Sequence, residues 1–256
     1  MNDQTKARDT VMKGLTLATG ISLIGMAAAA GQDHSKGADA FVELANKQVS
    51  VRFDAASGAV ASVSNRVLGI AYTIDAPAPS LFELMTLAGQ AKTRLQNVVP
   101  AAGSLSGHSL TREADRQTLQ LDYRVPAGTG GVVQVTCKAT LMDSAGEVRW
   151  TVAVDNRAEG VEVVEVVYPI LGGLRIGGKT EDNFLAWPKW GAGRLIEAPQ
   201  KQGRLNGTYV GGGATMAWMD LFSRPAEAGI PACGLYFASH DPSLLMTGLY
   251  SHPADD

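Results

Sequence analysis

The chain has 256 residues, a hydrophobic fraction of 45% and a formal net charge of -3 at pH 7. This length is sufficient for one large domain with a substantial buried core. The sequence contains no basic block that could neutralise a phosphate backbone, so it predicts no nucleic-acid partner. Its 29 glycines are typical of a chain with many turns.

The N-terminus has the order of features that is typical of a secretory signal peptide. Three basic residues precede a charge-free stretch over residues 14–30, in which Ala27-Ala28-Ala29 fits a cleavage site. An uncleaved membrane anchor is the alternative, because a stretch of about 17 residues approaches the length that spans a bilayer. The stretch is rich in small residues and weakly apolar. We therefore expect residues 1–30 to be removed, residues 31–40 to form a linker, and the mature protein to be secreted or periplasmic without a membrane partner.

Alternation of apolar and polar residues with period two predicts most of the strands. Residues 49–54 and 60–65 alternate on either side of a glycine-containing turn, which indicates a hairpin. Residues 119–125, 133–141 and 148–154 each place apolar side chains on one face and polar side chains on the other. Three successive strands of this kind predict an antiparallel meander over a core.

The second half of the chain gives a less regular pattern. Residues 161–171 are evenly apolar, which predicts a strand that is covered on both faces or changes sheets. Residues 183–213 lack a clean period and predict a long loop of the kind that is often functional. Residues 80–91 are the one segment that resembles a helix. Alternation returns over residues 214–222, 233–239 and 244–250. The pattern as a whole predicts one all-β, antiparallel sandwich domain over residues 41–256.

The two cysteines, Cys137 and Cys233, allow two interpretations. They can form one disulfide in an oxidising compartment, or they can be two buried thiols that behave as small apolar side chains. Cys137 occupies the apolar row of a predicted strand, which favours buried thiols. The sequence has neither a CxxC spacing nor histidines at metal-ligand spacing, so it predicts no metal site and no cofactor.

The common catalytic motifs are absent from the sequence, including the GxSxG turn, the HExxH zinc motif and the P-loop. A more specific candidate is the aromatic segment with Trp187, Lys189 and Trp190, which lies in the stretch without a period. Sugar rings stack their C–H faces on aromatic rings while polar side chains bond their hydroxyls, so this segment predicts a sugar contact. In the alternative interpretation, both tryptophans are buried and cap one end of the sandwich.

Two further polar positions are candidates for a binding site. Asp220 lies on a predicted strand and shares a face with Trp218, which places its carboxylate either in solvent or in a polar pocket. His240 and Asp241 follow another predicted strand. A histidine titrates near neutral pH and an aspartate can orient it, whereas the alternative for this pair is a polar turn before Pro242.

Several segments resemble an uncharacterised bacterial family of predicted glycoside hydrolases. The segments that carry the resemblance are NFLAWPKWGAG (183–193), GGGATMAWMDLF (211–222), GLYFASHDPS (234–243), Asn46 with VSVRFDAASGAVASVSN (49–65), and LFEL (81–84). The resemblance implies a galactose-mutarotase-like β-supersandwich, which such proteins usually continue with a (β/α)₈ barrel that holds the catalytic carboxylates. No alternation of strands and helices follows residue 250, so we expect this chain to lack the barrel.

Three hypotheses for function follow. The first is a noncatalytic, carbohydrate-associated domain of an exported glycoside-hydrolase-like protein, which binds or borders a glycan. Its expected sugar contacts are Trp187, Lys189, Trp190, Asp220, His240 and Asp241. The second is a mutarotase-type sugar epimerase, whose chemistry conventionally uses a glutamate base and a histidine acid. His240 can supply the acid, but the last glutamate, Glu227, lies in a Pro/Gly-rich segment. The third is a structural or protein-binding sandwich without a ligand.

Overall fold

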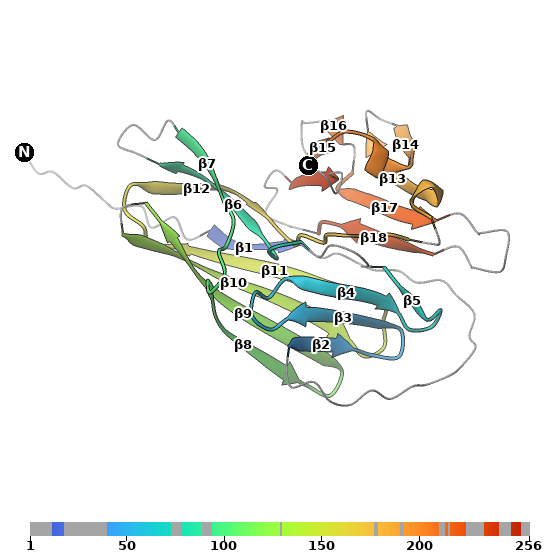
Figure 1. The fold of residues 1–256 in the computed structure, drawn as a ribbon, viewed down its shortest axis with the longest axis horizontal. Coiled ribbons are helices and arrows are strands. Elements are labelled where there is room, and N and C mark those ends of the chain that lie inside the picture. Colours follow the sequence, from blue (N-terminus) through green and yellow to red (C-terminus); the bar gives the residue numbers. More distant parts are fainter. Residues whose placement is uncertain are drawn as a thin grey trace, which may run out of the picture.

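The structure is a computed structural model. It describes residues 12–17, 40–72, 78–88, 94–128, 130–176, 179–189, 192–209, 213–214, 216–223, 233–240 and 247–251. Within these ranges the chain forms four β-sheets with no α-helix, and nearly all of the strand pairs are antiparallel (Figure 1). The predicted all-β class is therefore confirmed. No helix in the described ranges has the length and apolarity needed to cross a membrane.

The largest meander is a five-stranded sheet with the order β1-β11-β10-β9-β8. It contains β1 (Met12–Leu17), β8 (Leu105–Arg112), β9 (Arg116–Ala127), β10 (Gly131–Met142) and β11 (Val148–Asn156). β9, β10 and β11 pair antiparallel in chain order, which confirms the predicted meander. Their buried residues alternate with partly exposed ones along each strand, so one face of the sheet lies against the core.

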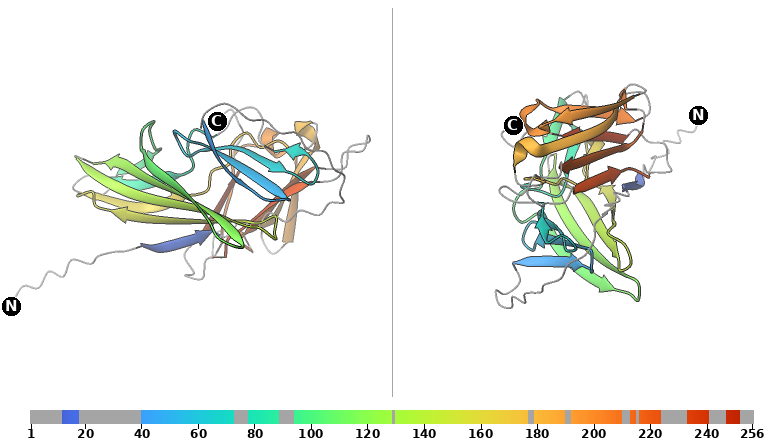
Figure 2. Two further views of the ribbon diagram at one scale, coloured as in Figure 1. Left: turned by 90° about the horizontal axis from the view of Figure 1, so that it is seen from below. Right: turned by 90° about the vertical axis from the view of Figure 1, so that its right-hand side faces the viewer.

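A four-stranded sheet packs against the core face of this meander. It has the order β2-β3-β4-β5, with β2 (Phe41–Ala45), β3 (Val49–Asp54), β4 (Val60–Asn65) and β5 (Ile70–Ala71). β3 and β4 form the predicted hairpin, because they pair antiparallel around the turn that contains Gly58. Figure 2 shows the blue strands of this sheet as a layer over the green and yellow strands of the five-stranded sheet.

The third sheet corrects the one predicted helix. Its order is β12-β6-β7, with β6 (Glu83–Ala88), β7 (Arg94–Val98) and β12 (Val161–Val167). β6 lies where a helix was expected, but it pairs with a neighbour on each side. Leu84 and Thr86 are buried while Met85 and Leu87 are partly exposed, which is the period of a strand. Pairing along both edges therefore overrides the helical preference of this short segment.

The C-terminal strands form a seven-stranded sheet, which corrects the expected loop over residues 183–213. Its order is β18-β17-β13-β16-β15-β19, with β14 paired to β13, and only the β15–β16 pair is parallel within the described ranges. Figures 1 and 2 show these orange and red strands gathered on one side of the molecule. The strands are β13 (Asn183–Lys189), β14 (Ala192–Glu197), β15 (Leu205–Tyr209), β16 (Gly213–Ala214), β17 (Trp218–Ser223), β18 (Gly234–Ala238) and β19 (Thr247–Ser251). Two 3-10 turns, η1 (Thr180–Asp182) and η2 (Pro199–Lys201), flank β13 and β14.

The main core brings together the apolar rows of the first three sheets. Trp150 of β11 is 1% exposed and contacts Phe53 of β3 with ring centroids 5.8 Å apart. Tyr168, which follows β12, packs edge-on against the same tryptophan at 6.0 Å. Cys137 of β10 and Cys233 before β18 are buried free thiols, which confirms the interpretation of two small apolar side chains.

The N-terminal segment is described only in part. β1 lies inside the predicted signal peptide, and its backbone pairs antiparallel with β11 at the edge of the five-stranded sheet. The predicted cleavage site, the linker up to residue 39 and the rest of residues 1–30 lie outside the described residues. Removal of this segment and export of the protein therefore stay predictions.

Candidate functional site

Two strands of the C-terminal sheet bring aromatic rings and a carboxylate to one face. In the antiparallel pair of β17 and β18, Asp220 lies opposite Tyr236 and Trp218 lies opposite Ala238. Directly opposed side chains lie on the same face of a sheet, as do alternate residues of one strand. Trp218, Asp220 and Tyr236 therefore share a face, and all three side chains are partly exposed.

The other face of the same two strands packs into the protein interior. Leu235 and Phe237 of β18 are buried in the main core, where Met219 and Leu221 of β17 pack against the buried residues. This apolar row fixes the orientation of the strands, because a shift by one residue would turn it toward solvent. The partly exposed face with Trp218, Asp220 and Tyr236 is thus held in place by the packing behind it. We refer to these three residues as the Trp–Asp–Tyr site.

The two aromatic rings of the site form one joint surface. The ring centroids of Trp218 and Tyr236 lie 5.8 Å apart, and the ring planes meet at 32°. The indole Nε1 of Trp218 also lies 3.3 Å from the Sδ atom of Met216, to which it donates. These contacts limit the rotation of Trp218 and keep the two tilted rings next to each other.

The carboxylate of Asp220 lies on the same face as these two rings. Among the described residues it makes neither a hydrogen bond nor an ion pair, and burial raises its pKa above the usual aspartate value. The pKa of Tyr236 is raised as well, first by its own burial and then by the charge of Asp220. A half-buried carboxylate with free acceptor positions is suited to bind donor groups of a ligand.

Small neighbours leave room around this carboxylate. Ala186 of β13 lies directly opposite Asp220 on the other side of β17. Gly234 of β18 approaches it so closely that an added Cβ would lie 3.2 Å from Oδ1 of Asp220 and 2.9 Å from Cβ of Phe222. Larger residues at these two positions would narrow the space beside the Trp–Asp–Tyr site.

The structure changes the interpretation of Trp187. This residue lies in β13 and is only 2% exposed, within a small apolar cluster with Leu185, Ile196 and Leu249. Gly207 of β15 packs on its ring, since an added Cβ there would lie 2.7 Å from Cζ2 of Trp187. The expectation of an exposed aromatic loop is wrong for Trp187, and the alternative of a buried tryptophan is correct. Its ring has no free face for a sugar.

The other expected contact residues are placed only in part. Lys189 ends β13, where the structure describes its backbone, whereas Trp190 and Asp241 lie outside the described residues. His240 is exposed just after β18. The preceding Ser239 donates its backbone N–H to the carbonyl of Ala217 at 2.8 Å, which holds this end of β18 beside the start of β17. His240 therefore follows β18, which pairs with the strand of Asp220. The positions of Trp190 and Asp241 stay predictions.

Sequence reasoning missed Tyr236 as a member of the site. The alternation of Trp218 and Asp220 is visible along one strand, but the partner of Asp220 depends on the register between β17 and β18. Residues 224–232, which connect the two strands, do not determine that register by their length alone. The one signal for this member of the site in the sequence was Tyr236 itself, an aromatic residue with a polar hydroxyl inside the strand GLYFA.

A concave region lies between two strands at sheet edges, away from the Trp–Asp–Tyr site. The groove between β2 and β8 has a volume of about 670 Å³, and it is lined among others by Phe41, Glu43, His108, Arg112 and Glu113. The guanidinium of Arg52 lies over the ring of Phe41, 4.3 Å from its centroid, and occupies one face of that ring. The groove thus combines charges of both signs with one partly covered aromatic ring, and it contains none of the expected contact residues.

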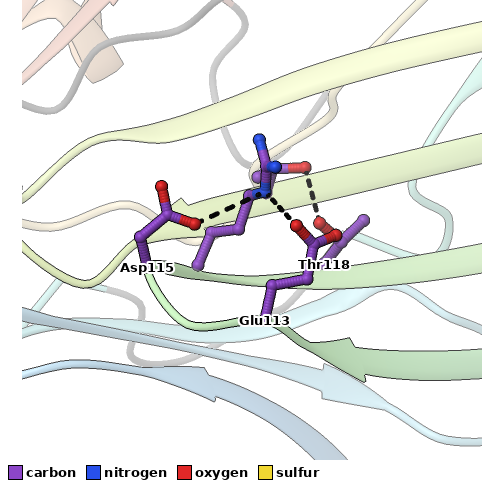
Figure 3. Close-up of polar contacts among 5 residues, drawn as sticks. Glu113, Asp115 and Thr118 are labelled. Atoms are coloured by element: carbon purple, nitrogen blue, oxygen red, sulfur yellow. Dashed lines mark hydrogen bonds and ion pairs between the residues drawn. The ribbon is translucent and has the colours of Figure 1, made fainter.

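Ion pairs fix the charged rim of this groove. Nε of Arg116 lies 2.7 Å from a carboxylate oxygen of Glu113 and 3.7 Å from one of Asp115 (Figure 3). The bond to Glu113 and the charges of both carboxylates raise the pKa of Arg116. Behind this turn, the hydroxyls of Thr118 and Thr140 are hydrogen-bonded at 3.1 Å across β9 and β10. Arg116 thereby offsets part of the negative charge of Glu113 and Asp115 at this exposed rim, where Asp143 also lines the groove.

Comparisons with known proteins add no relative to this description. The chain matches no protein-family model, no curated protein and no solved structure. The described residues also contain no group of three or more His, Cys, Asp or Glu side chains that could hold a metal ion. Fold and site together define an all-β protein with antiparallel sheets, whose C-terminal sheet carries two aromatic rings beside a carboxylate.

Proposed function

We propose that the protein is a noncatalytic carbohydrate-binding domain and that the Trp–Asp–Tyr site binds the glycan. One observation carries the proposal: two rings in contact, at 5.8 Å and 32°, lie on the same face as the carboxylate of Asp220, which has no bonding partner among the described residues. This combination suits a sugar, whose C–H face is apolar and whose edge is lined with hydroxyl donors.

The chemistry of the two parts is complementary. Trp218 and Tyr236 offer two neighbouring apolar rings, inclined at 32°, on which a pyranose ring can lie, and burial of large aromatic rings dominates the energetics of such contacts. Asp220 accepts hydrogen bonds from sugar hydroxyls, and a bond to an ionised acceptor is roughly twice as strong as a neutral one. The small residues beside Asp220 let the edge of the ring approach the carboxylate.

The composition of the site favours binding over hydrolysis. Glycoside hydrolysis generally uses two carboxyl groups about 5–9.5 Å apart on either side of the scissile bond. Within the bounds of β13, β17 and β18, Asp220 is the one acidic residue. A single carboxylate can anchor a hydroxyl, but it cannot supply both an acid and a nucleophile. We therefore assign no catalytic step to this site.

We extend the proposal to the family and the location suggested by the sequence. The antiparallel sheets with a shared core support a galactose-mutarotase-like supersandwich, in which a carbohydrate-binding role is an ordinary one. The basic start and charge-free stretch of residues 1–30 support export to the periplasm or the medium, where glycans are accessible ligands.

A binding titration tests this function. Calorimetry against a panel of neutral and acidic oligosaccharides should detect at least one ligand, and that ligand should change the tryptophan fluorescence. Trp218→Ala should weaken binding by at least about tenfold, because it removes half of the stacking surface. Tyr209→Ala is the matched control, since Tyr209 is an exposed aromatic residue on β15 of the same sheet. Absence of binding across the panel, or equal losses for both variants, would contradict the proposal.

A further inference from the structure

The edge of β11 that lies away from β10 carries a self-complementary pattern of charges. β11 has nine residues and pairs with β10 without a register shift over its whole length. Its core-facing residues Val148, Trp150 and Val152 are buried, while Arg149 and Ala153 on the other face are exposed. On its second side, among the described residues, β11 pairs with the short strand β1 between Trp150 and Val154, so β1 covers the middle of this edge.

The charges along β11 follow an ordered pattern. Glu147 and Arg149 lie at its start and Asp155 and Arg157 at its end, so the signs read negative, positive, negative, positive. Each pair is bridged across one end of the strand, with 2.7 Å between Arg149 and Glu147 and 2.6 Å between Arg157 and Asp155. All four side chains are at least one-third exposed, so they are free to exchange partners at low cost.

This pattern matches itself when a second strand runs in the opposite direction. With Val152 opposite Val152 of another copy, Arg149 of one copy lies opposite Asp155 of the other. The same register places Glu147 opposite Arg157, and because it is symmetric each of these contacts occurs twice. A shift by two residues in either direction loses this complete match of opposite charges. Opposite charges directly across two strands are stabilising and like charges are destabilising, so the register is specified.

The faces of the two strands match in the same register. Residues that lie opposite each other in this register are both even-numbered or both odd-numbered. Core-facing residues of one copy therefore lie opposite core-facing residues of the other. Trp150 of one copy lies opposite Val154 of the other, on the side where the apolar rows of both sheets lie. We propose that β11 is a homodimer interface, at which two copies pair antiparallel about Val152 and join their five-stranded sheets into one.

The opposite edge of the sheet lacks these properties. β8 is interrupted by a register shift between Leu105 and Gly107, which bends the strand and disrupts regular pairing. Its charged residue Arg112 lies at one end and lines the groove beside β2. No symmetric register opposes an acidic residue to it within β8. β11 is therefore the straight and charge-matched edge, and β8 is the bent one.

The segment β1 decides when the interface is accessible. It covers Trp150 to Val154 of β11, with an irregularity between Met12 and Leu15, and so occupies the centre of the proposed interface. β1 and the β11 strand of a second copy cannot pair with this edge at the same time. The chain with β1 in place is expected to be a monomer, and release of β1 is expected to allow dimerisation. This inference does not depend on sugar binding.

The first test releases β1 within the full chain. Adjacent backbone N–H groups of a strand point to opposite sides, so Leu15→Pro/Thr16→Pro removes one donor toward β11 whichever side each residue faces. Light scattering after size exclusion, over a series of concentrations, should show a monomer for the wild type and a dimer for this variant. A circular-dichroism spectrum checks that the variant keeps its strands. A folded variant that stays monomeric at every concentration would overturn the proposal.

The second test reverses charges in the released chain. Arg149→Glu or Asp155→Arg alone places two like-charge pairs across the interface, and each should weaken the dimer by roughly tenfold. The combined variant restores opposite charges between copies, although it places like charges next to each other within the strand, and it should recover dimerisation. Arg116→Glu, which breaks an exposed ion pair on β9, a strand that β10 separates from β11, is the control. This register would be contradicted if the single changes left dimerisation unchanged, or if the combined variant did not recover it.

A disulfide between copies measures the register directly. Thr151 of one copy should lie opposite Ala153 of the other, within the Cβ separation that a disulfide bridges. Thr151→Cys/Ala153→Cys in the released chain should therefore give a covalent dimer on mild oxidation. Ser109→Cys/Thr111→Cys on β8 is the matched control and should stay monomeric. Equal cross-linking at both edges would contradict a specific β11 interface.

Discussion

The central sheets, as we call the five-, four- and three-stranded sheets around the main core, use their aromatic residues in a different way from the C-terminal sheet. In the central region Trp150 contacts both Phe53 and Tyr168 inside the core, where the three rings are at most 4% exposed. In the C-terminal sheet Trp218 and Tyr236 contact each other on a face that is partly open. The same residue types therefore stabilise the fold in one region and provide a surface in the other. What differs is whether a second layer covers the face.

The largest expected effect is the loss of the core tryptophan. Trp150→Ala removes a ring that contacts both Phe53 and Tyr168, and it should destabilise the fold by about 3–5 kcal/mol. Trp218→Ala removes a partly exposed ring and should cost less than about 2 kcal/mol. Denaturant unfolding of both variants measures the difference. Equal losses of stability would show that the Trp–Asp–Tyr site is part of the core and would remove the distinction between the two regions.

A smaller effect is expected from the protonation of Asp220. Burial raises the pKa of this carboxyl, so it takes up its proton at a higher pH than an ordinary aspartate. As the pH falls through this raised pKa, the site loses its charged acceptor and sugar affinity should fall, by up to about tenfold if one charge-assisted bond is lost. Calorimetry at several pH values measures this decrease, which Asp220→Asn should abolish.

The stability of the same variant provides the control. A raised pKa of an acid means that the charged form is disfavoured in the folded state, so this penalty is present above the raised pKa and is relieved as the pH falls. Asp220→Asn should therefore leave the fold at least as stable at neutral pH while it weakens sugar binding. A variant that loses stability would indicate a structural role for Asp220 instead.

The smallest effect concerns a turn of the central sheets. Asp54 accepts hydrogen bonds from the backbone N–H and the hydroxyl of Ser57, both at 2.8 Å, and these bonds lower its pKa. Asp54→Ala should cost about 1 kcal/mol without changing sugar affinity. Because the pKa is lowered in the folded state, this contribution is present above the unfolded-state pKa and is lost as the pH falls through the folded-state value. Thermal unfolding at neutral and acidic pH measures it, and a difference that grows on acidification would contradict this account.

The sequence predicts the strands that are buried on one face and fails where both faces are covered. β9, β10 and β11 alternate strictly because their outer faces meet solvent. In β13, by contrast, Asn183, Phe184 and Leu185 are buried in succession, as are Trp187 and Pro188. A strand that is buried on both faces has no alternation, which is why β13 resembled part of a loop.

The candidate site was accessible from the sequence only in part. Asp220 and Trp218 lie two residues apart in one strand, so their common face follows from the period of a strand. Tyr236 joins them through the register of β17 and β18, which the apolar packing of Leu235 and Phe237 determines. The burial of Trp187 likewise depends on the approach of Gly207 from β15, a contact between strands that no local pattern encodes.

A crystal structure of the protein with a bound oligosaccharide from the titration tests the central claim most directly. It should show one sugar ring stacked over Trp218 and Tyr236, with a hydroxyl donating to a carboxylate oxygen of Asp220. A glycan held in the groove between β2 and β8, or anywhere else away from β17 and β18, would contradict the assignment of the site.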